Sequence, residues 1–407
     1  MQEVITNLIQ ASESKIILVV LDGLGGLPAK EGPYKGLTEL ESAHTPNLDA
    51  LARSSACGLH LPVGYGITPG SGPGHLGLFG YEPKRYIIGR GILEAVGLGM
   101  EVKNTDIALR CNYATMKDGL IVDRRAGRPP TEVSRKLTER LSAEIKEIDG
   151  VKIFFAPGME HRFAVVMRFQ DPLPEDASSL NDTDPQREGM PPLKLVPQSP
   201  NAERTADIAE KLISKAVEIL KTQERANYIL LRGFSEPPKM QTFKEAYGLK
   251  ALAIAAYPMY RGLASLIGMD SPEVKGDIDE EIEFLNAHYS EYDFFFVHIK
   301  KVDSYGEDGN FEAKMKKIEE FDRALPKILN LKPDVLIITG DHSTPSIMRS
   351  HSWHPVPVLL NSKYVLGGLS EGFSERECFK GELGVIPTTA LMPLALANSG
   401  RLKKFGA

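Results

Sequence analysis

The sequence has few cysteines and no long apolar run. The only three cysteines, Cys57, Cys111 and Cys378, lie far apart and form no C-x-x-C pair. This usage is typical of reduced intracellular thiols and excludes a disulfide framework and a thiolate zinc site. No run approaches the roughly 20 apolar residues of a membrane-spanning helix. The stretch from Met1 to Lys15 also lacks the apolar centre of a signal peptide. We therefore expect a cytoplasmic protein with no membrane partner.

A surplus of positive charge is also missing. The 407 residues include 48 Lys and Arg against 54 Asp and Glu, which gives a formal net charge of −6. Nucleic-acid-binding domains usually present a basic face, so we expect no nucleic-acid partner. A small anionic substrate is still compatible with this balance, because a local arginine cluster can act against the net charge. The oligomeric state does not follow from these numbers.

The most informative feature that is present is a set of strand-like runs that end on acids. Three apolar runs are each followed by an acid: 16–21 by Asp22, 293–299 by Asp303, and 335–339 by Asp341 and His342. Such runs are typical of buried parallel strands. Ligands of open α/β sheets gather beyond the carboxyl ends of strands. The pattern therefore predicts that these side chains share one crevice.

Carboxylates together with imidazoles suggest a metal site in that crevice. His351 and His354 follow the third acid closely. Mixed Asp/His ligation suits Mn²⁺, Zn²⁺ or Fe²⁺, and a mostly carboxylate set favours Mn²⁺. A single acid after a strand is more often only a helix cap or turn former, so the grouping carries the prediction. We expect the remaining histidines at the surface or at caps, except for His298 in the core: His44, His60, His161 and His288.

The order of the patterns predicts two domains. Short alternating segments between residues 107 and 169 indicate an antiparallel sheet, and an α/β rhythm returns after residue 250. The simplest architecture is an α/β domain built from residues 1–108 and 236–407, with a smaller α+β domain inserted at 109–235. Within the first, Pro357 predicts that the strand at 356–360 lies at a sheet edge, because proline cannot donate to a ladder.

A loop rich in glycine and proline, residues 64–75, contains Ser71. Glycines on both sides of Ser71 remove side-chain bulk, and a serine exposed in this way can be a nucleophile if a base or metal lowers its pKa. Pro69 excludes a G-x-S-x-G elbow, and no Gly-Lys-Ser/Thr follows to make a phosphate-binding P-loop. Taken alone, the segment is more typical of a structural loop that leads into a helix near Leu76.

Arginines cluster in the predicted insertion. Residues 123–128 read D-R-R-A-G-R, and Arg162 and Arg232 follow later. Planar guanidinium groups bind phosphate and carboxylate with two hydrogen bonds each. This density is compatible equally with an anion site and with a solvated basic turn.

Six segments, in the same order along the chain, resemble those of the archaeal-type cofactor-independent (2,3-bisphosphoglycerate-independent) phosphoglycerate mutases of the alkaline phosphatase superfamily. They are Asp22-Gly23, 45–49, 66–75, 123–128, 308–312 and 340–345. The resemblance spans nearly the whole chain. It implies an alkaline-phosphatase-like three-layer α/β domain with a mostly parallel central sheet, plus an inserted α+β domain that closes over the substrate. The implied reaction interconverts 3-phosphoglycerate and 2-phosphoglycerate through a phosphoserine, in glycolysis and gluconeogenesis, without 2,3-bisphosphoglycerate.

The resemblance also implies site residues for two divalent metal ions and for a small phosphorylated carboxylic acid. The ions would be Mn²⁺ first, with Mg²⁺, Co²⁺ or Zn²⁺ as alternatives. One ion would be held by Asp22, Ser71, Asp341 and His342, and the other by Asp303, Glu307 and His351. Ser71 would be the nucleophile. The substrate would be bound by Asp123, Arg124, Arg125, Arg128, Arg162, Arg232 and Arg261.

One position departs from the family pattern. Glu307 stands where the family has a histidine that binds metal, four residues after Asp303. A carboxylate can still bind, and the site would then favour Mn²⁺ or Mg²⁺ over Zn²⁺, with His354 as a candidate substitute ligand. Two alternatives follow. One is a metal-dependent phosphatase or phosphotransferase acting on another phosphorylated acid. The other is a catalytically silent relative that binds a metabolite.

Overall fold

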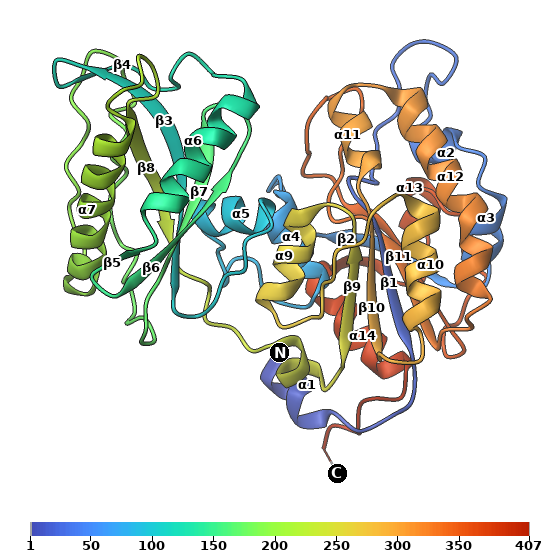
Figure 1. Cartoon of the computed structure of the whole chain (residues 1–407). Coiled ribbons are helices and arrows are strands. Elements are labelled where there is room, and N and C mark those ends of the chain that lie inside the picture. The colour runs from blue at the N-terminus through green and yellow to red at the C-terminus, as the bar shows by residue number, and fades with distance from the viewer. Residues whose placement is uncertain (1, 407) are drawn as a thin grey trace. The chain divides into compact units, whose positions relative to one another are not determined.

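The computed structural model describes residues 2–406, which divide into two compact units (Figure 1). Unit 1 comprises the described residues up to Ile87 and from Met240 onward, and unit 2 comprises Ile88–Lys239. The predicted insertion, 109–235, lies inside unit 2. That unit begins earlier because α5 (Arg90–Gly97) packs on its sheet: a Cβ at Gly91 would come within 2.0 Å of the carbonyl oxygen of Ala108.

Unit 1 is built on a seven-stranded sheet. Its strands, in spatial order, are β13 (Gly384–Pro387), β2 (Ala56–Leu61), β12 (Val356–Ser362), β11 (Val335–Thr339), β1 (Ile16–Leu21), β10 (Phe294–Ile299) and β9 (Ala251–Ala255). The four strands from β11 to β9 run parallel to one another, β13 is parallel to β2, and β12 is antiparallel to both its neighbours. The strands β11, β1 and β10 are therefore adjacent and share one carboxyl-terminal edge.

Helices cover both faces of this sheet (Figure 1). On one face, Ile17 and Val19 of β1 belong to a buried apolar cluster with α3 (Pro46–Ala52), α10 (Ile278–His288) and α12 (Phe311–Leu329). On the other face, Phe296 and His298 of β10 contact α4 (Ser71–Leu78) and α9 (Pro258–Leu266) through aromatic rings. Strands buried on both faces are apolar throughout, as β1 is. The predicted three-layer α/β class with a mostly parallel sheet is confirmed.

Unit 2 is an antiparallel sheet packed against helices. Its strands run in the order β4 (Leu120–Asp123), β3 (Asp106–Lys117), β7 (Arg162–Arg168), β6 (Val151–Pro157) and β5 (Glu147–Ile148), and β8 (Tyr228–Ser235) also pairs with β3. α6 (Thr131–Glu144) and α7 (Glu203–Leu220) bury their apolar faces in the same core as β3 and β7. The alternation of apolar and polar residues therefore indicated the correct kind of sheet.

The remaining elements are short helices and turns. They are α1 (Gln2–Leu8), α2 (Glu39–Ser42), α8 (Phe243–Tyr247), α11 (Lys301–Glu307), α13 (Glu375–Phe379), α14 (Leu391–Asn398) and the 3₁₀ turns Pro200–Ala202 and Thr388–Ala390. Among residues 2–406, no helix combines the length and the apolar character that crossing a membrane would need.

The predicted edge position of β12 is wrong. β12 lies between β11 and β2, inside the sheet. Its pairing with β11 begins only at Val358, which is opposite Thr339, so Pro357 lies beyond that ladder. On this side the Pro357 carbonyl accepts a hydrogen bond from the Thr339 hydroxyl at 2.7 Å. A proline near the start of an interior strand is tolerated because its missing N–H leaves no gap in the ladder.

Candidate metal centre and active site

Two overlapping groups of metal-ligand side chains lie beyond the shared edge of β11, β1 and β10. Asp22 directly follows β1, and Asp341 and His342 follow β11 with one residue between. Asp303 lies in α11, which follows β10. Asp22, Asp341 and His342 form what we call the buried group, and Asp303, His342 and His351 form the outer group. Within each group the ligand atoms lie within 4.8 Å of one another.

The buried group is shielded completely from solvent. The side chains of Asp22, Asp341 and His342 are all 0% exposed. His342 Nε2 lies 3.3 Å from Asp22 Oδ1 and 3.2 Å from Asp341 Oδ2. Neither of these two buried oxygens accepts a hydrogen bond from any described residue. Buried charged oxygens without donors are costly, so this donor set fits a divalent cation that would complete it.

The two buried carboxyl groups are pushed in opposite directions. Burial raises the pKa of Asp22, but the nearby His298 ring, together with the charges of His342 and Lys300, holds it well below its usual range. Burial and the negative charge of Asp22 raise the pKa of Asp341 to about 7. Two carboxylates that disfavour each other's ionisation mark a place where added positive charge is strongly stabilised.

Ser71 is held against this group by the glycine-rich loop. It is the first residue of α4, with Gly70 as the cap, and its Oγ lies 3.4 Å from His342 Nε2. A Cβ at Gly74 would come within 2.6 Å of the Asp341 carbonyl oxygen, so only glycine allows α4 to approach so closely. The helix begins at Ser71 and not near Leu76, because Pro73 falls in its first turn, where proline is tolerated.

The outer group is more open. His351 Nε2 lies 3.4 Å from Asp303 Oδ1 and 3.7 Å from Glu307 Oε1. The Glu307 side chain is 53% exposed and is not part of the outer group. His351 Nδ1 lies 3.0 Å from the Pro69 carbonyl oxygen, to which only an N–H can donate, and its ring stacks on His342 at 3.7 Å between centroids. Nδ1 therefore carries a proton, and Nε2 faces the two acids.

The pKa values of the outer group follow from its ion pairs. Burial raises the pKa of Asp303, but the contact with His351 and the charges of Lys300 and His342 together lower it to about 2. Burial lowers the pKa of His351, but the hydrogen bonds to Asp303 and to the Pro69 carbonyl raise it to about 9. His354 lies outside both groups, with Nδ1 3.1 Å from Ser352 Oγ.

Several polar side chains that contact these ligands were not predicted from the sequence. Lys300 Nζ lies 3.0 Å from Asp22 Oδ2 and also donates to Asp303, so it joins the two groups. The Tyr260 hydroxyl donates to Asp22 Oδ2 at 2.5 Å. His75 Nδ1 lies 2.8 Å from the Ser71 carbonyl oxygen and 3.2 Å from Asp341 Oδ2.

The sequence contained hints of some of these residues. Lys300 precedes Asp303 by three residues, and His75 lies in the loop of Ser71. His298 is in the core as expected, but its Nε2 lies 3.4 Å from Asp22, and neither of its ring nitrogens has a hydrogen-bond partner among the described residues.

Arginines line a separate pocket in unit 2. It has a volume of about 250 Å³ and is lined by Arg110, Asn112, Arg124, Arg125, Arg128, His161, Arg162 and Arg232. Five of these arginines were predicted as substrate ligands, whereas Arg110 and Asn112 were not. Both lie on β3, where the alternation of the strand gave no sign of a site. Six guanidinium groups around one small cavity are suited to an anion.

The turn between β4 and α6 is shaped by Asp123. Its carboxylate accepts hydrogen bonds from the backbone N–H groups of Arg125 and Gly127 at 2.8 and 2.6 Å. Ala126 and Arg128 have positive φ values of 50° and 49°, an uncommon conformation for residues with side chains. Asp123 therefore shapes the turn that carries Arg125 and Arg128, and it does not line the pocket itself.

Two predicted arginines differ in their surroundings. Arg124 makes two hydrogen bonds of 2.7 Å to the buried carboxylate of Asp184, so part of its charge is already neutralised. Arg261 lies in α9 of unit 1, where its guanidinium donates to the Ala256 carbonyl oxygen at 3.4 Å. It therefore does not belong to the pocket of unit 2.

The expected surface positions of His60 and His161 are wrong. His60 is fully buried in β2, with Nδ1 2.5 Å from the Thr388 hydroxyl, and burial lowers its pKa to about 3. His161 is 5% exposed and lines the arginine pocket. Burial and the charge of Arg162 lower the pKa of His161 to about 4, so it adds a neutral imidazole to a cationic pocket.

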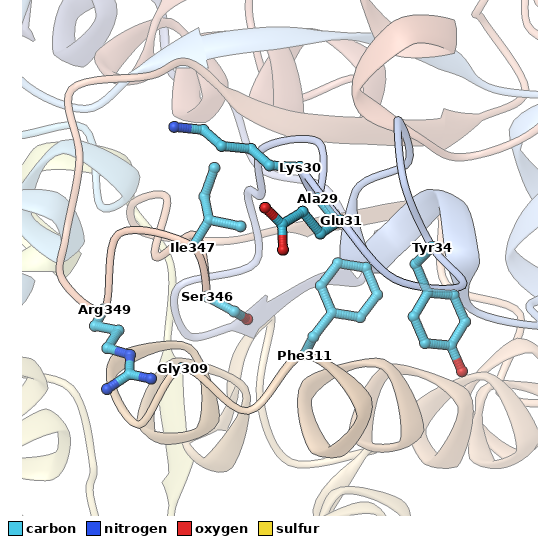
Figure 2. Close-up of a pocket in the computed structure, with 9 residues that line it drawn as sticks. All are labelled: Ala29, Lys30, Glu31, Tyr34, Gly309, Phe311, Ser346, Ile347 and Arg349. Atoms are coloured by element: carbon cyan, nitrogen blue, oxygen red, sulfur yellow. The ribbon is translucent and has the colours of Figure 1, made fainter.

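A wider pocket in unit 1 contains none of the predicted site residues. It has a volume of about 420 Å³. The residues that line it are drawn in Figure 2. Tyr34 and Phe311 stack at 4.9 Å along one side of it, and Lys30, Glu31 and Arg349 also line it. The metal-ligand side chains lie outside it, so its size does not mark the chemical centre.

Comparison with known proteins gives one consistent result. A sequence model of the family described as 2,3-bisphosphoglycerate-independent phosphoglycerate mutase matches residues 52–226. A relative from Aquifex aeolicus, named a probable 2,3-bisphosphoglycerate-independent phosphoglycerate mutase, is 60% identical over 100% of both chains. One of the same name from Thermosipho africanus is 52% identical over 100% of this chain and 99% of its own.

A solved structure agrees with these relatives. The cofactor-independent phosphoglycerate mutase from Thermoplasma acidophilum is 31% identical, with a TM-score of 0.80, and the match covers 95% of this chain and 100% of that chain.

Proposed function

The chain belongs to the family of 2,3-bisphosphoglycerate-independent phosphoglycerate mutases, and we propose that it interconverts 3-phosphoglycerate and 2-phosphoglycerate. We assign the phosphoryl transfer to Ser71, through a phosphoserine intermediate. We assign the binding of two divalent metal ions, with Mn²⁺ favoured, to the buried group with Ser71 and to the outer group with Glu307. No 2,3-bisphosphoglycerate takes part in this scheme.

The observation that carries the proposal is the position of Ser71. Its hydroxyl lies 3.4 Å from His342 Nε2, at the edge of a cluster whose buried oxygens have no donors. It is also the first residue of a helix, where backbone N–H groups and the helix dipole favour a phosphoryl group. Among the described residues, the histidine that contacts the Ser71 hydroxyl is His342. Because His342 belongs to both metal groups, it is not available as a general base for Ser71.

The reaction balances without water. When bound, the two ions would lower the pKa of the Ser71 hydroxyl and offset the charge on the transferring phosphoryl group. Ser71 Oγ forms a bond to phosphorus while the bond from phosphorus to the C3 oxygen breaks. The proton lost by Ser71 is equivalent to the one that the C3 hydroxyl gains. The C2 hydroxyl then attacks phosphorus as the bond from phosphorus to Ser71 breaks. The proton that the C2 hydroxyl loses is equivalent to the one that Ser71 regains, and 2-phosphoglycerate results.

The arginine pocket of unit 2 is assigned to the substrate anion. Arg125 and Arg162 have no carboxylate within 4.0 Å among the described residues, so their guanidinium groups are available for a ligand. Arg124 and Arg232 both contact Asp184, which orients them. We assign to these arginines the task of holding the glycerate while the phosphoryl group is on Ser71. Water must be kept out at that stage, because hydrolysis of the phosphoserine would make the protein a phosphatase.

Arg261 is assigned a different part. It follows Tyr260, whose hydroxyl contacts Asp22, and so belongs to the helix that packs next to the buried group. We assign to its cation a contact with the phosphoryl group of the substrate. We also assign the protein to glycolysis and gluconeogenesis in the cytoplasm, because the proposed reaction belongs to those pathways.

The direct test is a mutase assay with purified protein and Mn²⁺. We expect 3-phosphoglycerate to be converted to 2-phosphoglycerate without added 2,3-bisphosphoglycerate, with little free phosphate, and EDTA should abolish conversion. Ser71→Ala should also abolish it, while Ser290→Ala, which changes an exposed serine, should not. Activity in the presence of EDTA, or in Ser71→Ala, would overturn the proposal.

The exposed position of Glu307 favours a second candidate. Its side chain is 53% exposed and 3.7 Å from His351, so the outer site is less complete than the buried one. A weakly held outer ion would leave either a phosphatase acting on a phosphorylated acid or a silent metabolite-binding protein. Inorganic phosphate as the main product would identify the first. Ligand binding with no turnover at saturating Mn²⁺ would identify the second.

A further inference from the structure

The Thr344 side chain lies between the ligands of the two metal groups. It is buried on the segment that follows β11 and is 0% exposed. Its Oγ1 donates a hydrogen bond to Asp303 Oδ1 at 2.8 Å and lies 3.0 Å from His342 Nδ1. One hydroxyl therefore contacts a ligand from each strand end, β10 and β11.

The direction of these hydrogen bonds follows from counting protons. A threonine hydroxyl has one proton and two acceptor lone pairs. An ionised carboxylate such as that of Asp303 has no proton to donate and can only accept. The hydroxyl proton is thus committed to Asp303, and His342 Nδ1 must carry its own proton to complete the second contact. This leaves His342 Nε2 unprotonated in the neutral ring, facing Asp22, Asp341 and Ser71.

Lys314 of α12 fixes the segment that carries Thr344. Its ammonium is 0% exposed and donates to three backbone carbonyl oxygens, those of Gly23, Gly25 and Thr344, at 2.9, 3.1 and 2.8 Å. All three ammonium protons are used. The first two carbonyls follow Asp22 and the third follows His342, so one side chain joins two ligand-bearing segments.

Tight packing leaves these segments little freedom to shift. A Cβ at Gly23 would come within 2.5 Å of Thr344 Oγ1, and a Cβ at Gly306 would come within 2.3 Å of the Thr344 carbonyl oxygen. The Thr344 N–H also donates to the Gly23 and Gly25 carbonyl oxygens, at 3.3 and 3.0 Å. The position of the Thr344 hydroxyl is therefore set by backbone contacts as well as by Lys314.

We propose that Thr344, held in place by Lys314, is a positioning residue for both metal groups: it fixes the Nδ1-protonated form of His342 and orients Asp303. Neither residue touches the substrate or an ion in this scheme. Hydrogen bonds that orient metal ligands are worth about 10- to 100-fold in metal affinity. The inference rests on the proposed two-metal function.

The first test compares Thr344→Val with Thr344→Ser. Mn²⁺ affinity is measured without substrate, from the free Mn²⁺ signal in electron paramagnetic resonance. We expect Thr344→Val to bind Mn²⁺ about 10- to 100-fold more weakly and Thr344→Ser to stay within about threefold of wild type. Equal losses in both variants, or no loss in Thr344→Val, would overturn the inference. Wild type that binds no Mn²⁺ would instead overturn the proposed function.

A second measurement uses the wild-type protein, so it does not depend on whether a variant folds. Nitrogen-15 NMR of the imidazoles in metal-free wild type should show His342 with the proton on Nδ1. Protonation at Nε2 alone would overturn the inference.

A variant pair on α12 tests the role of Lys314. Lys314→Met should weaken Mn²⁺ binding about 10-fold, whereas Lys316→Met, which changes an exposed neighbour, should leave it unchanged. A purely structural role for Lys314 would lower the unfolding temperature of metal-free protein without changing Mn²⁺ affinity, and that result would contradict the proposal.

Discussion

The buried group and the outer group lie at the same edge of one sheet and share His342, yet they differ in enclosure. In the buried group all three ligand side chains are 0% exposed. In the outer group Asp303 is 3% exposed and His351 is 20% exposed, and the neighbouring Glu307 is 53% exposed. The three ligand side chains of the buried group are shielded from solvent, whereas the outer group lies beside the exposed side chain of Glu307.

This difference is consistent with the expected departure from the family pattern at Glu307. A change of ligand in the buried group would leave a buried carboxylate or imidazole without its partner, which costs several kilocalories per mole. At the outer group, water can complete the coordination of an ion, so a glutamate is tolerated in place of a histidine. We therefore expect the buried group to bind its ion more tightly and the outer group to limit activity at low metal concentration.

The largest effect should come from Ser71, the proposed nucleophile beside the buried group. Ser71→Ala should lower kcat by about 10⁴-fold or more, because no described side chain can take its place. Its effect on Mn²⁺ affinity should be smaller, since Asp22, Asp341 and His342 remain. Mutase rates and Mn²⁺ titrations on the same preparation measure both, and a kcat within tenfold of wild type would remove Ser71 from the mechanism.

The next effect should separate the two groups directly. Asp22→Asn should remove the tighter of two bound Mn²⁺ ions and Asp303→Asn the weaker, each with a loss of about 100-fold or more in affinity for that ion. Metal analysis after dialysis against a graded series of Mn²⁺ concentrations would show which ion is lost. If Asp303→Asn removed the tighter ion, the assignment of strong and weak sites would be reversed.

Glu307 provides a milder perturbation of the outer group alone. We expect Glu307→Gln to weaken the second ion about 10-fold, because a neutral amide replaces a carboxylate 3.7 Å from His351 Nε2. Glu307→His should retain the second ion and shift its preference from Mn²⁺ towards Zn²⁺. Competition between the two metals in wild type and both variants checks this. Identical profiles in all three proteins would show that Glu307 is not a ligand.

The smallest effect should come from a residue that supports the buried group. Tyr260→Phe removes the hydroxyl that donates to Asp22 Oδ2 at 2.5 Å and leaves the ring that stacks on His298. We expect the affinity of the first ion to fall by about 10-fold and that of the second to stay unchanged. Metal titration with calorimetry distinguishes the two ions. A loss confined to the second ion would contradict the placement of Tyr260.

The strand ends could be predicted from the sequence because each is a local signal. An apolar run followed by an acid indicates a buried strand and a ligand position, and the three runs before Asp22, Asp303 and Asp341 became adjacent parallel strands. The alternating segments of unit 2 could be predicted as antiparallel strands for the same reason. The prediction from Pro357 was wrong because the effect of a proline depends on which side of its strand is paired at that residue. This pairing, in turn, depends on the whole sheet.

The supporting side chains could not be predicted because their contacts join distant parts of the chain. Lys314 lies 291 positions from Gly23, whose carbonyl it contacts, and Tyr260 is 238 positions from Asp22. Nothing in the sequence around Arg110 distinguishes it from a solvent-facing arginine on a strand. Such residues can be identified only from the folded structure, which shows which acceptor each buried donor contacts.

We expect two metal sites of unequal enclosure to activate Ser71. Titration of metal-free wild type with Mn²⁺, with bound metal and mutase rate measured on the same samples, tests it most directly. We expect two bound ions of unequal affinity, with activity appearing as the second, weaker ion binds. Full activity with one ion bound, or activity that persists when EDTA has removed both, would contradict it.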